Sequence, residues 1–544
     1  MLPGMDLQHS YAALPPTFWS AVEPTPVAAP RLLAWNTALA DALGLDPVLE
    51  ARAAAMFSGN APPAQARPIA MAYAGHQFGH FVPQLGDGRA ILLGEVTDPQ
   101  GRRFDVQLKG AGPTPYSRNG DGRAAIGPVL REYLVSEAMA ALGVPTTRAL
   151  AAVATGEHVL RDEVLPGAVL TRVAASHVRV GTFQFFAARG DDEAVRILAD
   201  HVIARHYPEL ADAEDRYLAL LRAVAGRQAA LVAAWLQVGF IHGVMNTDNM
   251  AVSGETIDYG PCAFLDAYDP AKVFSSIDRN GRYAYANQPP IAQWNLARLA
   301  ECLLPHFRRQ GDEGVADARE AIEAFAGRFG AAWLAGFRRK LGLATEEAGD
   351  ESLVRDFLAA LEAVQADFTL SFRALAVAAG DPGFDELPPL PKTPAMDAWL
   401  ARWRARCGNE AGGSDGLVQR LKASNPAVIP RNHRVEAALS AAAGGDSAPF
   451  ESLLAAVRRP YDDGPAQRGF MAAPAAGEQM FRRGTDARAG NFGMGSRLAC
   501  HGAMVTDQPF NSTPASLGPA AACSCRAPRF AAMLPPVPRP RRRM

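Results

Sequence analysis

Three residues in one short stretch have the types and spacing to hold a metal ion beside a nucleotide. His242 follows a long predicted helix, Asn249 lies seven residues later, and Asp258 ends a short strand predicted at 256–258. Magnesium binds through one or two carboxylates together with substrate phosphates, and it prefers oxygen ligands such as those of Asp and Asn. The stretch therefore predicts a divalent-metal site that also takes up phosphate groups.

The spacing matches the catalytic pattern of protein kinases, H-R-D-L-x-x-x-N followed by D-F-G. The kinase Asn also lies seven residues after the His, and the segment 258–260, Asp-Tyr-Gly, stands in the place of D-F-G. One position differs. The kinase base lies two residues after the His, where this chain has Val244, which cannot accept a proton. Asp248 is the nearest replacement, so the pattern predicts a kinase-like metal site with a displaced base and does not favour efficient γ-phosphoryl transfer.

Upstream residues supply the other parts of such a nucleotide site. The segment 85–89, Leu-Gly-Asp-Gly-Arg, predicts a glycine-containing turn whose backbone N–H groups can approach phosphates. Lys109 ends a predicted strand and Glu132 lies on the helix predicted after it. Kinases use a Lys–Glu ion pair of this kind to hold the Lys amine against the α- and β-phosphates.

Long strings around these residues resemble the selenoprotein O family of protein adenylyltransferases, in its bacterial YdiU-like branch. The likeness covers about residues 10–463, and its matching stretches are 73–79, 107–118, 121–124, 131–134, 171–183 and 242–249. The resemblance implies an α+β, protein-kinase-like bilobal fold that binds ATP in a flipped orientation. It also implies transfer of AMP to Ser, Thr or Tyr hydroxyls of proteins with release of pyrophosphate. UMP transfer from UTP and self-AMPylation are further activities to test.

The resemblance implies a role for each matching residue. Asp248 is the general base, and Asn249 and Asp258 hold Mg²⁺ or Mn²⁺. Glu132 forms the supporting ion pair with Lys109. The residues expected to contact the nucleotide are Gly86, Gly88, Arg89, Lys109, Asp121, Gly122, Arg172, Arg179 and Asp258.

The number of basic residues supports AMP transfer by a separate physical argument. Attack at the α-phosphorus expels pyrophosphate, which carries more charge than the ADP that a kinase expels. Fixed cations are therefore needed where this charge develops. Arg89, Lys109, Arg172 and Arg179 outnumber the single Lys of the kinase pattern, and a guanidinium binds phosphate oxygens in pairs. Two other functions stay open, namely a phosphotransferase that uses Asp248 as its base and an inactive nucleotide-binding interaction module.

The elements that position these residues follow from periodicity and from turn residues. We expect strands at 89–96, 103–109, 250–252 and 256–258, and helices at 31–43, 128–142 and 217–238. Most of 293–379, and the chain from a Pro-rich break at 387–392 to about 461, is also predicted to be helical.

These elements suggest five regions along the chain. We expect an N-terminal extension over 1–70, a kinase-like N-lobe over 71–165 and a C-lobe with the catalytic loop over 166–330. A helical region over 331–463 and a divergent, disordered tail over 464–544 follow. Cys523 and Cys525 lie in that tail, where a redox role, a lineage-specific tail and a shifted reading frame are alternatives.

Composition limits the class of protein. The chain has 544 residues, a formal net charge of −2 and 49% hydrophobic residues, so no excess of positive charge favours a nucleic-acid or membrane-surface partner. Six scattered cysteines do not make a disulfide framework. The first residues lack the pattern of a secretory signal, and no apolar run of about 20 residues is evident. We expect a cytoplasmic enzyme whose partners are ATP and protein substrates.

Overall fold

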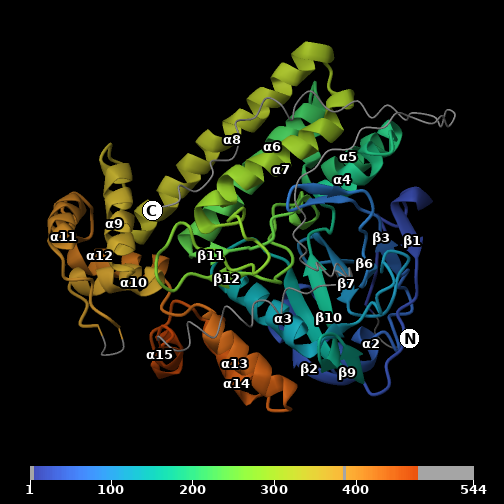
Figure 1. Ribbon diagram of the computed structural model, residues 1–544, viewed down its shortest axis with the longest axis horizontal. Helices are drawn as coiled ribbons and strands as arrows, with labels where there is room; N and C mark the ends of the chain where they lie inside the picture. Colours follow the sequence, from blue (N-terminus) through green and yellow to red (C-terminus); the bar gives the residue numbers. More distant parts are fainter. Residues whose placement is uncertain (1–4, 384–386, 476–544) are drawn as a thin grey trace, which may run out of the picture. The chain divides into compact units, whose positions relative to one another are not determined.

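The computed structural model describes residues 5–383 and 387–475 (Figure 1). These residues combine an antiparallel sheet with many helices, which confirms the predicted α+β class. The finer prediction of a kinase-like bilobal fold, and the division into five regions, stay predictions.

Within the described residues, eight strands form the main sheet, with β7 and β10 near its centre. The path runs β1-β3-β6-β7-β10-β9-β2, and β8 pairs with β10 off this path. The strands are β1 (Trp19–Ala21), β2 (Arg31–Trp35), β3 (Ile69–Met71), β6 (Ala90–Thr97), β7 (Arg103–Lys109), β8 (Ala124–Ala125), β9 (Arg148–Leu160) and β10 (Val164–Ala174). The strands predicted at 89–96 and 103–109 are confirmed as β6 and β7, because their apolar residues fill the core beneath the sheet.

The helix predicted over 31–43 is wrong in its first half. Residues 31–35 form β2, which pairs with β9, and only Thr37–Ala42 is helical (α1). Leu32 and Trp35 pack against the core of the sheet, so pairing with β9 outweighs the helical pattern. The two short strands predicted at 250–252 and 256–258 are also wrong, since Ala251 and Thr256 form only isolated bridges.

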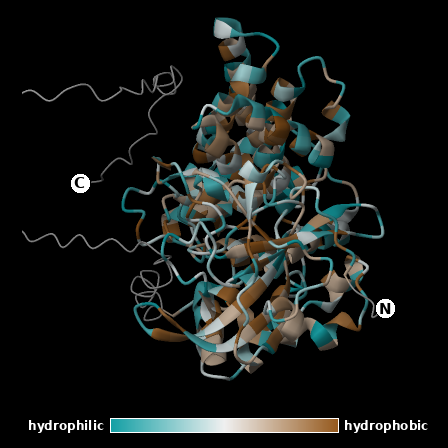
Figure 2. Cartoon of the chain, turned by 90° about the vertical axis from the view of Figure 1, so that its right-hand side faces the viewer, coloured by the Kyte–Doolittle hydropathy of each residue, from teal (hydrophilic) through white to brown (hydrophobic). Residues whose placement is uncertain are grey.

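The helix predicted at 128–142 is α3 (Ile126–Ala141), and the long helix predicted at 217–238 is α6 (Arg216–Gln237). Figure 2 shows hydrophobic residues on both the strands and the helices, and two large apolar clusters lie inside them. The remaining helices are α2 (Leu49–Phe57), α4 (Val180–Ala187), α5 (Asp192–His206), α7 (Gln288–Leu303), α8 (Gly311–Lys340), α9 (Asp350–Val364), α10 (Phe368–Ala378), α11 (Pro394–Cys407), α12 (Gly413–Ser424), α13 (Asn432–Ala443), α14 (Ala448–Val457) and α15 (Pro465–Met471).

Among the described residues, α6 alone is long and apolar enough to cross a membrane. Its apolar window is 61% buried inside the protein, and the helix packs against α7 and α8. A core helix of a globular protein has this burial.

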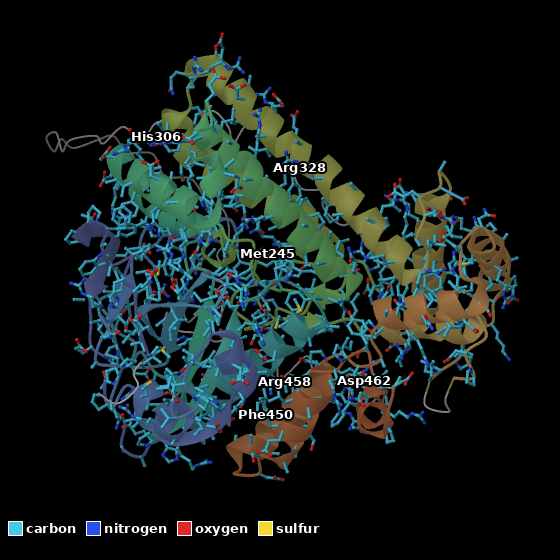
Figure 3. The ribbon with its side chains drawn as sticks, turned by 180° about the vertical axis from the view of Figure 1, so that it is seen from behind. Met245, His306, Arg328, Phe450, Arg458 and Asp462 are labelled. Carbon is cyan, nitrogen blue, oxygen red and sulfur yellow. The ribbon has the colours of Figure 1, made fainter. Side chains whose placement is uncertain are left out.

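Helix α3 is held from outside by the C-terminal helices α13 and α14. Arg131 donates to Glu436 on α13 (2.6 Å) and to the carbonyl of Cys262 (2.5 Å). Figure 3 labels Phe450 of α14 and Arg458, which directly follows that helix. The Phe450 ring centroid lies 6.2 Å from that of Tyr133, and the Arg458 Cζ lies 6.0 Å from the Tyr133 centroid. These contacts fix the position of α3, and they therefore help to position Glu132, which lies on the same helix.

The tail differs from its prediction at its beginning. Residues 465–471 form α15, Met471 is buried, and Arg431 donates its Nε to the Met471 carbonyl (2.7 Å). The predicted disorder is therefore wrong for this turn of helix, because a buried guanidinium fixes its end. Cys523 and Cys525 lie outside the described residues.

Candidate active site

Lys109, Glu132, Arg172 and Asp258 meet in one cluster of alternating charges. Lys109 Nζ donates to Glu132 (2.6 Å) and to Asp258 (2.8 Å). Arg172 Nε donates to the other oxygen of Glu132 (2.7 Å). The predicted Lys–Glu ion pair is present, and it extends to the predicted metal ligand on one side and to a predicted nucleotide contact on the other.

The surrounding charges set the ionisation of both carboxyl groups. Burial acts to raise the pKa of Glu132, but the positive charges of Arg172 and Lys109 outweigh it and hold the pKa below its usual value. For Asp258, desolvation likewise acts upward, and Lys109 and Arg172 shift the pKa well below its usual range. Both groups are therefore carboxylates at neutral pH, as metal binding and ion pairing require.

Local folding explains why these side chains converge. Lys109 ends β7, where it pairs with Ala90 in β6 and Leu170 in β10, and Arg172 lies two residues further along β10. Asp258 has a left-handed backbone (φ 69°), which is uncommon for Asp. The preceding residue is held by His242, whose Nε2 donates to the Ile257 carbonyl (2.9 Å). Burial lowers the pKa of His242, so the ring acts as a neutral positioning group for this segment.

Asp248 lies in a second polar group, beneath the hairpin of β4 (Gly75–Gln77) and β5 (His80–Val82). Gln77 Nε2 donates to Asp248 Oδ2 (3.3 Å), and Arg179 donates to the Asp248 carbonyl (3.4 Å). Asp248 Oδ1 is buried and has no hydrogen-bond partner within the described structure. A Cβ on Gly75 would lie 2.6 Å from this oxygen, so only glycine fits there.

The environment of Asp248 is the opposite of that of Asp258. Desolvation raises the pKa of Asp248 to about 6, against the lowering effects of a backbone hydrogen bond, Arg179 and Gln77. A carboxyl group with a pKa near the working pH is suited to accept a proton in a reaction. Two nearby carboxyl groups with pKa values shifted in opposite directions suit a base and a metal ligand.

Arg179 and Arg172 are buried and do not form a solvated basic face. Arg179 lies 3.7 Å from Asp87 and packs over the Tyr73 ring at 4.3 Å. Asp87 also accepts from Gln107 (3.2 Å), whose amide oxygen accepts from Arg172 (3.4 Å). The two predicted nucleotide contacts therefore belong to one continuous network.

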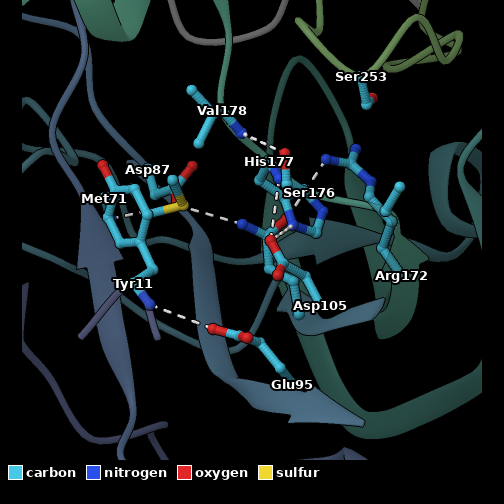
Figure 4. A network of polar contacts seen from close by, with 12 residues as sticks. Tyr11, Met71, Asp87, Glu95, Asp105, Arg172, Ser176, His177, Val178 and Ser253 are labelled. Atoms are coloured by element: carbon cyan, nitrogen blue, oxygen red, sulfur yellow. Dashed lines mark hydrogen bonds and ion pairs between the residues drawn. The ribbon is translucent and has the colours of Figure 1, made fainter. Parts of the chain in front are cut away.

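The sequence prediction missed several members of this network, drawn in Figure 4. Asp87 stands between the two predicted glycines, and its position in a glycine turn was a signal for it. His177 Nδ1 contacts Asp105 (2.9 Å), and Arg205 donates to the same carboxylate (2.6 Å). Asp105 and Arg205 lie outside every matching stretch, and His177 lies within 171–183 without a predicted role, because the partners of these residues are far apart along the chain.

Arg89 lies close to the first cluster. Burial lowers the pKa of its guanidinium, while the charges of Asp258 and Glu132 act to raise it. The interactions of Arg89 with both carboxylates agree with a cation placed beside the predicted metal ligand.

The predicted glycines and Asp121 lie in two other segments, where Gly86 and Gly122 are buried, Gly88 is half-buried and Asp121 is exposed. Asp121 pairs with Arg161 (2.8 Å), and a Cβ on Gly122 would lie 2.0 Å from the Gly112 carbonyl. Gly86 and Gly88 donate their N–H groups to the carbonyls of Tyr73 and Gly86. The Tyr116 ring would lie 2.2 Å from a Cβ on Gly86, so close packing explains this glycine in the structure. No direct contact joins these four residues to the Lys109 cluster within the described residues.

Asn249 and Asp258 each keep an oxygen atom of the kind that a divalent ion prefers, so their chemistry fits such an ion. Asn249 Nδ2 donates to the Val244 carbonyl (3.0 Å), so the amide oxygen is the atom that remains for a metal. The side chain of Asp258 is 35% exposed and only its Oδ1 is bound to Lys109. The described residues contain no cluster of three or more His, Cys, Asp or Glu able to hold a metal alone. A metal bound by these two residues would need phosphate oxygens and waters as its other ligands.

Comparison with known proteins agrees with this geometry. The family model described as "Protein adenylyltransferase SelO" matches residues 3–458. A protein nucleotidyltransferase YdiU of Rhizobium rhizogenes is 60% identical over 488 residues, which are 88% of this chain and 96% of the relative. One from a Bradyrhizobium species is 61% identical over 479 residues, 87% of this chain and 98% of that protein. The chain belongs to the SelO family of protein adenylyltransferases.

Proposed function

We propose that this protein transfers AMP from ATP to Ser, Thr or Tyr hydroxyl groups of proteins and releases pyrophosphate. The observation that carries the proposal is the pair of carboxyl groups with opposite environments. Asp258 is a carboxylate held against Lys109, while Asp248 is a buried acid whose pKa is about 6 and whose Oδ1 has no partner in the described structure. This pair supports one metal ligand and one general base.

In the proposed reaction, Asp248 accepts the proton of the substrate hydroxyl. The hydroxyl oxygen then forms a bond to the α-phosphorus, and the bond between that phosphorus and the oxygen bridging to the β-phosphate breaks. Pyrophosphate leaves with the electron pair of the broken bond. A divalent ion held by Asn249 and Asp258 would supply charge neutralisation at the phosphate oxygens.

The cations around the site support expulsion of pyrophosphate. Lys109 bridges two carboxylates, and Arg172 is fixed by Glu132, so both cations are pre-positioned before any substrate binds. Pre-positioned charge stabilises a developing anion without reorganisation during the reaction. We place the triphosphate across Arg89, Lys109, Arg172 and Arg179, and the rest of the nucleotide against Gly86, Gly88, Asp121 and Gly122.

The order of elements supports a kinase-like bilobal arrangement. The Lys is on a strand, the Glu on the following long helix, and the metal-binding residues come after the long helix α6. We retain the proposed regions 1–70, 71–165, 166–330 and 331–463 on that basis. Cytoplasmic location also stays a proposal, and it is supported by the three cysteines of the described residues, which are all free thiols.

ATP labelled at either the α- or the γ-phosphorus tests the proposed reaction. The full chain is incubated with a protein mixture and Mg²⁺ or Mn²⁺, and label retained on protein is measured. AMP transfer predicts retention of the α-label only. Retention of the γ-label alone would establish a phosphotransferase, and no retention of either label, with nucleotide binding intact, would establish an interaction module. Including UTP and omitting other proteins tests UMP transfer and self-AMPylation.

A further inference from the structure

Next to Asp248, three segments bring together a group of aromatic and cationic side chains. The Arg282 surface, as we call it, consists of Phe78, Phe81, Arg282, Tyr283 and Trp294. The Phe78 and Tyr283 rings lie 5.1 Å apart. Tyr283 OH and the Phe78 backbone N–H both donate to Asn246 Oδ1, at 2.7 and 3.0 Å. Because Asn246 lies two residues before Asp248, this surface borders the proposed base.

Arg282 is a fixed cation without an anionic partner in the described residues. Its Cζ lies 4.9 Å from the Trp294 ring centroid and 5.7 Å from that of Tyr283. Its Nε is buried and has no hydrogen-bond partner in this part of the chain. A guanidinium held between aromatic rings loses little freedom when it binds a carboxylate.

The nearest acidic side chain on the same loop is already occupied. Asp278 accepts from the backbone N–H groups of Arg282 (2.9 Å) and Tyr283 (2.7 Å). Asp278 therefore shapes the loop and presents Arg282, without neutralising the guanidinium. On the hairpin side the guanidinium lies close to Gly79, because a Cβ there would be in van der Waals contact with the Arg282 Cζ (3.6 Å).

A second Arg makes this region more positive. Arg298 lies 4.9 Å from the same Trp294 ring, and its charge is shared with Glu301 at 2.9 Å. The positive charge of both Arg side chains affects the pKa of His76. Burial lowers the pKa of His76 to about 4, its hydrogen bond with Gln184 opposes this shift, and the charges of Arg298 and Arg282 lower the pKa further.

The border of the surface is apolar and accessible. Phe81 is 39% exposed, and its ring lies 5.0 Å from the His76 ring. Exposed aromatic side chains next to a desolvated Arg are typical of surfaces that bind polypeptide segments. The charge of Arg282 selects the partner, since an unpaired guanidinium binds carboxylates best.

We propose that the Arg282 surface binds an acidic side chain next to the target hydroxyl of the protein substrate. Arg282 would pair with the carboxylate while Phe81 contacts the neighbouring residues, which would place the hydroxyl at Asp248. This inference rests on the proposed function, and it adds a preference for acidic substrate segments.

Two fluorescent peptides test the proposal. Both carry one Ser, flanked by Glu in one peptide and by Gln in the other, and their binding to the full chain is measured by anisotropy in the presence of ATP analogue and Mg²⁺. We expect the acidic peptide to bind wild type about tenfold more tightly. R282Q should reduce this ratio to about one, R282E should invert it, and R282K should keep part of it because charge remains.

R355Q is the control for removal of an Arg at a Trp ring elsewhere, because Arg355 lies over Trp333 (5.3 Å) on α9, where it is paired with Glu351 (2.7 Å). It should keep the wild-type ratio. ATP affinity, measured on every variant, reports whether each has folded. The inference would be overturned if wild type and R282Q showed the same ratio of affinities for the Glu and Gln peptides. It would also be overturned if folded R282Q bound ATP more weakly while this peptide ratio stayed unchanged. Failure of wild type to transfer AMP to any acceptor would instead refute the proposed function, while the binding ratio would still decide the role of Arg282.

Discussion

At the scale of single residues, the site depends on two carboxyl groups whose pKa values are shifted in opposite directions. Asp258 is held as a carboxylate by Lys109 and Arg172, whereas Asp248 is desolvated beneath Gly75 and receives one side-chain hydrogen bond, from Gln77. The same residue type therefore acquires two different proton affinities. The difference comes from neighbours that are far apart along the chain.

The raised pKa of Asp248 predicts the pH dependence of catalysis. Below pH 6 the group is protonated and cannot accept a proton, so kcat/KM should rise about tenfold per pH unit up to about pH 6 and then level off. A pH–rate profile with the acceptor well below its KM, saturating ATP and constant metal checks this. A rate that is independent of pH between 4.5 and 7 would contradict the assignment of Asp248 as base.

Asp248→Asn should separate function from stability. AMP transfer should fall by about 10²–10⁴-fold, because the base is lost while ATP affinity is retained. The folded-state pKa is raised above the unfolded value, so this group favours folding at low pH and loses that contribution as pH rises through about 6. At pH 7 the variant should therefore be more stable, by about 1–3 kcal/mol.

Denaturant unfolding of wild type and variant at pH 4 and pH 7 measures this change. The gain should be present at pH 7 and small at pH 4. Destabilisation of D248N at pH 7 would show that the ionised side chain contributes to folding, contrary to its desolvated position.

At the scale of elements, the position of Glu132 depends on helices that come much later in the chain. Helix α3 is bound to α13 and α14 through Arg131, Tyr133 and Glu137. Elements of the predicted helical region thus support the ion pair of the nucleotide site.

Arg131→Ala tests this support. The change leaves Glu436 without its partner and removes contacts to Asn432 and the Cys262 carbonyl, so it should lower stability by about 3 kcal/mol. Displacement of α3 should also raise the KM for ATP. Arg402→Ala, in the exposed Arg402–Asp356 pair, is the control and should cost about 0–1 kcal/mol. A loss of stability with unchanged KM would show that α3 keeps its position without α13.

Residue types and spacing predicted much of the site. Lys109, Glu132, Arg172 and Asp258 are identifiable from motifs and from family strings, and the structure brings them together. Gln77 was missed because it meets Asp248 across 171 positions of the chain. Elements were predicted where periodicity was long, as in α3 and α6. They were missed where pairing with a distant strand determines the secondary structure, as in the strand at 31–35, which pairs with β9.

At the scale of the whole molecule, nucleotide and metal should stabilise the fold together. The Lys109 cluster joins β7, β10, α3 and the segment around Asp258, so a ligand bound there links elements from different parts of the chain. If Asn249 and Asp258 hold a divalent ion as proposed, phosphate oxygens would be needed to complete its ligand shell.

Thermal unfolding tests this linkage. A non-hydrolysable ATP analogue with Mg²⁺ should raise Tm, with about 2.7 kcal/mol of stabilisation at one hundred times Kd. Chelation with EDTA should remove most of the effect, and Asp258→Ala should make the remaining shift insensitive to Mg²⁺. Equal shifts with and without the metal in wild type would contradict shared ligation.

The central claim is that Asp248 and the Asp258 metal site transfer AMP to hydroxyl groups. Intact-mass analysis of an acceptor protein after incubation with the full chain, ATP and Mg²⁺ or Mn²⁺ tests it most directly. We predict a mass increase of one adenylyl group with wild type, and under the same conditions little or no increase with D248N or D258A that still bind ATP. An increase of one phosphate group, or adenylylation by D248N at the wild-type rate, would contradict the account.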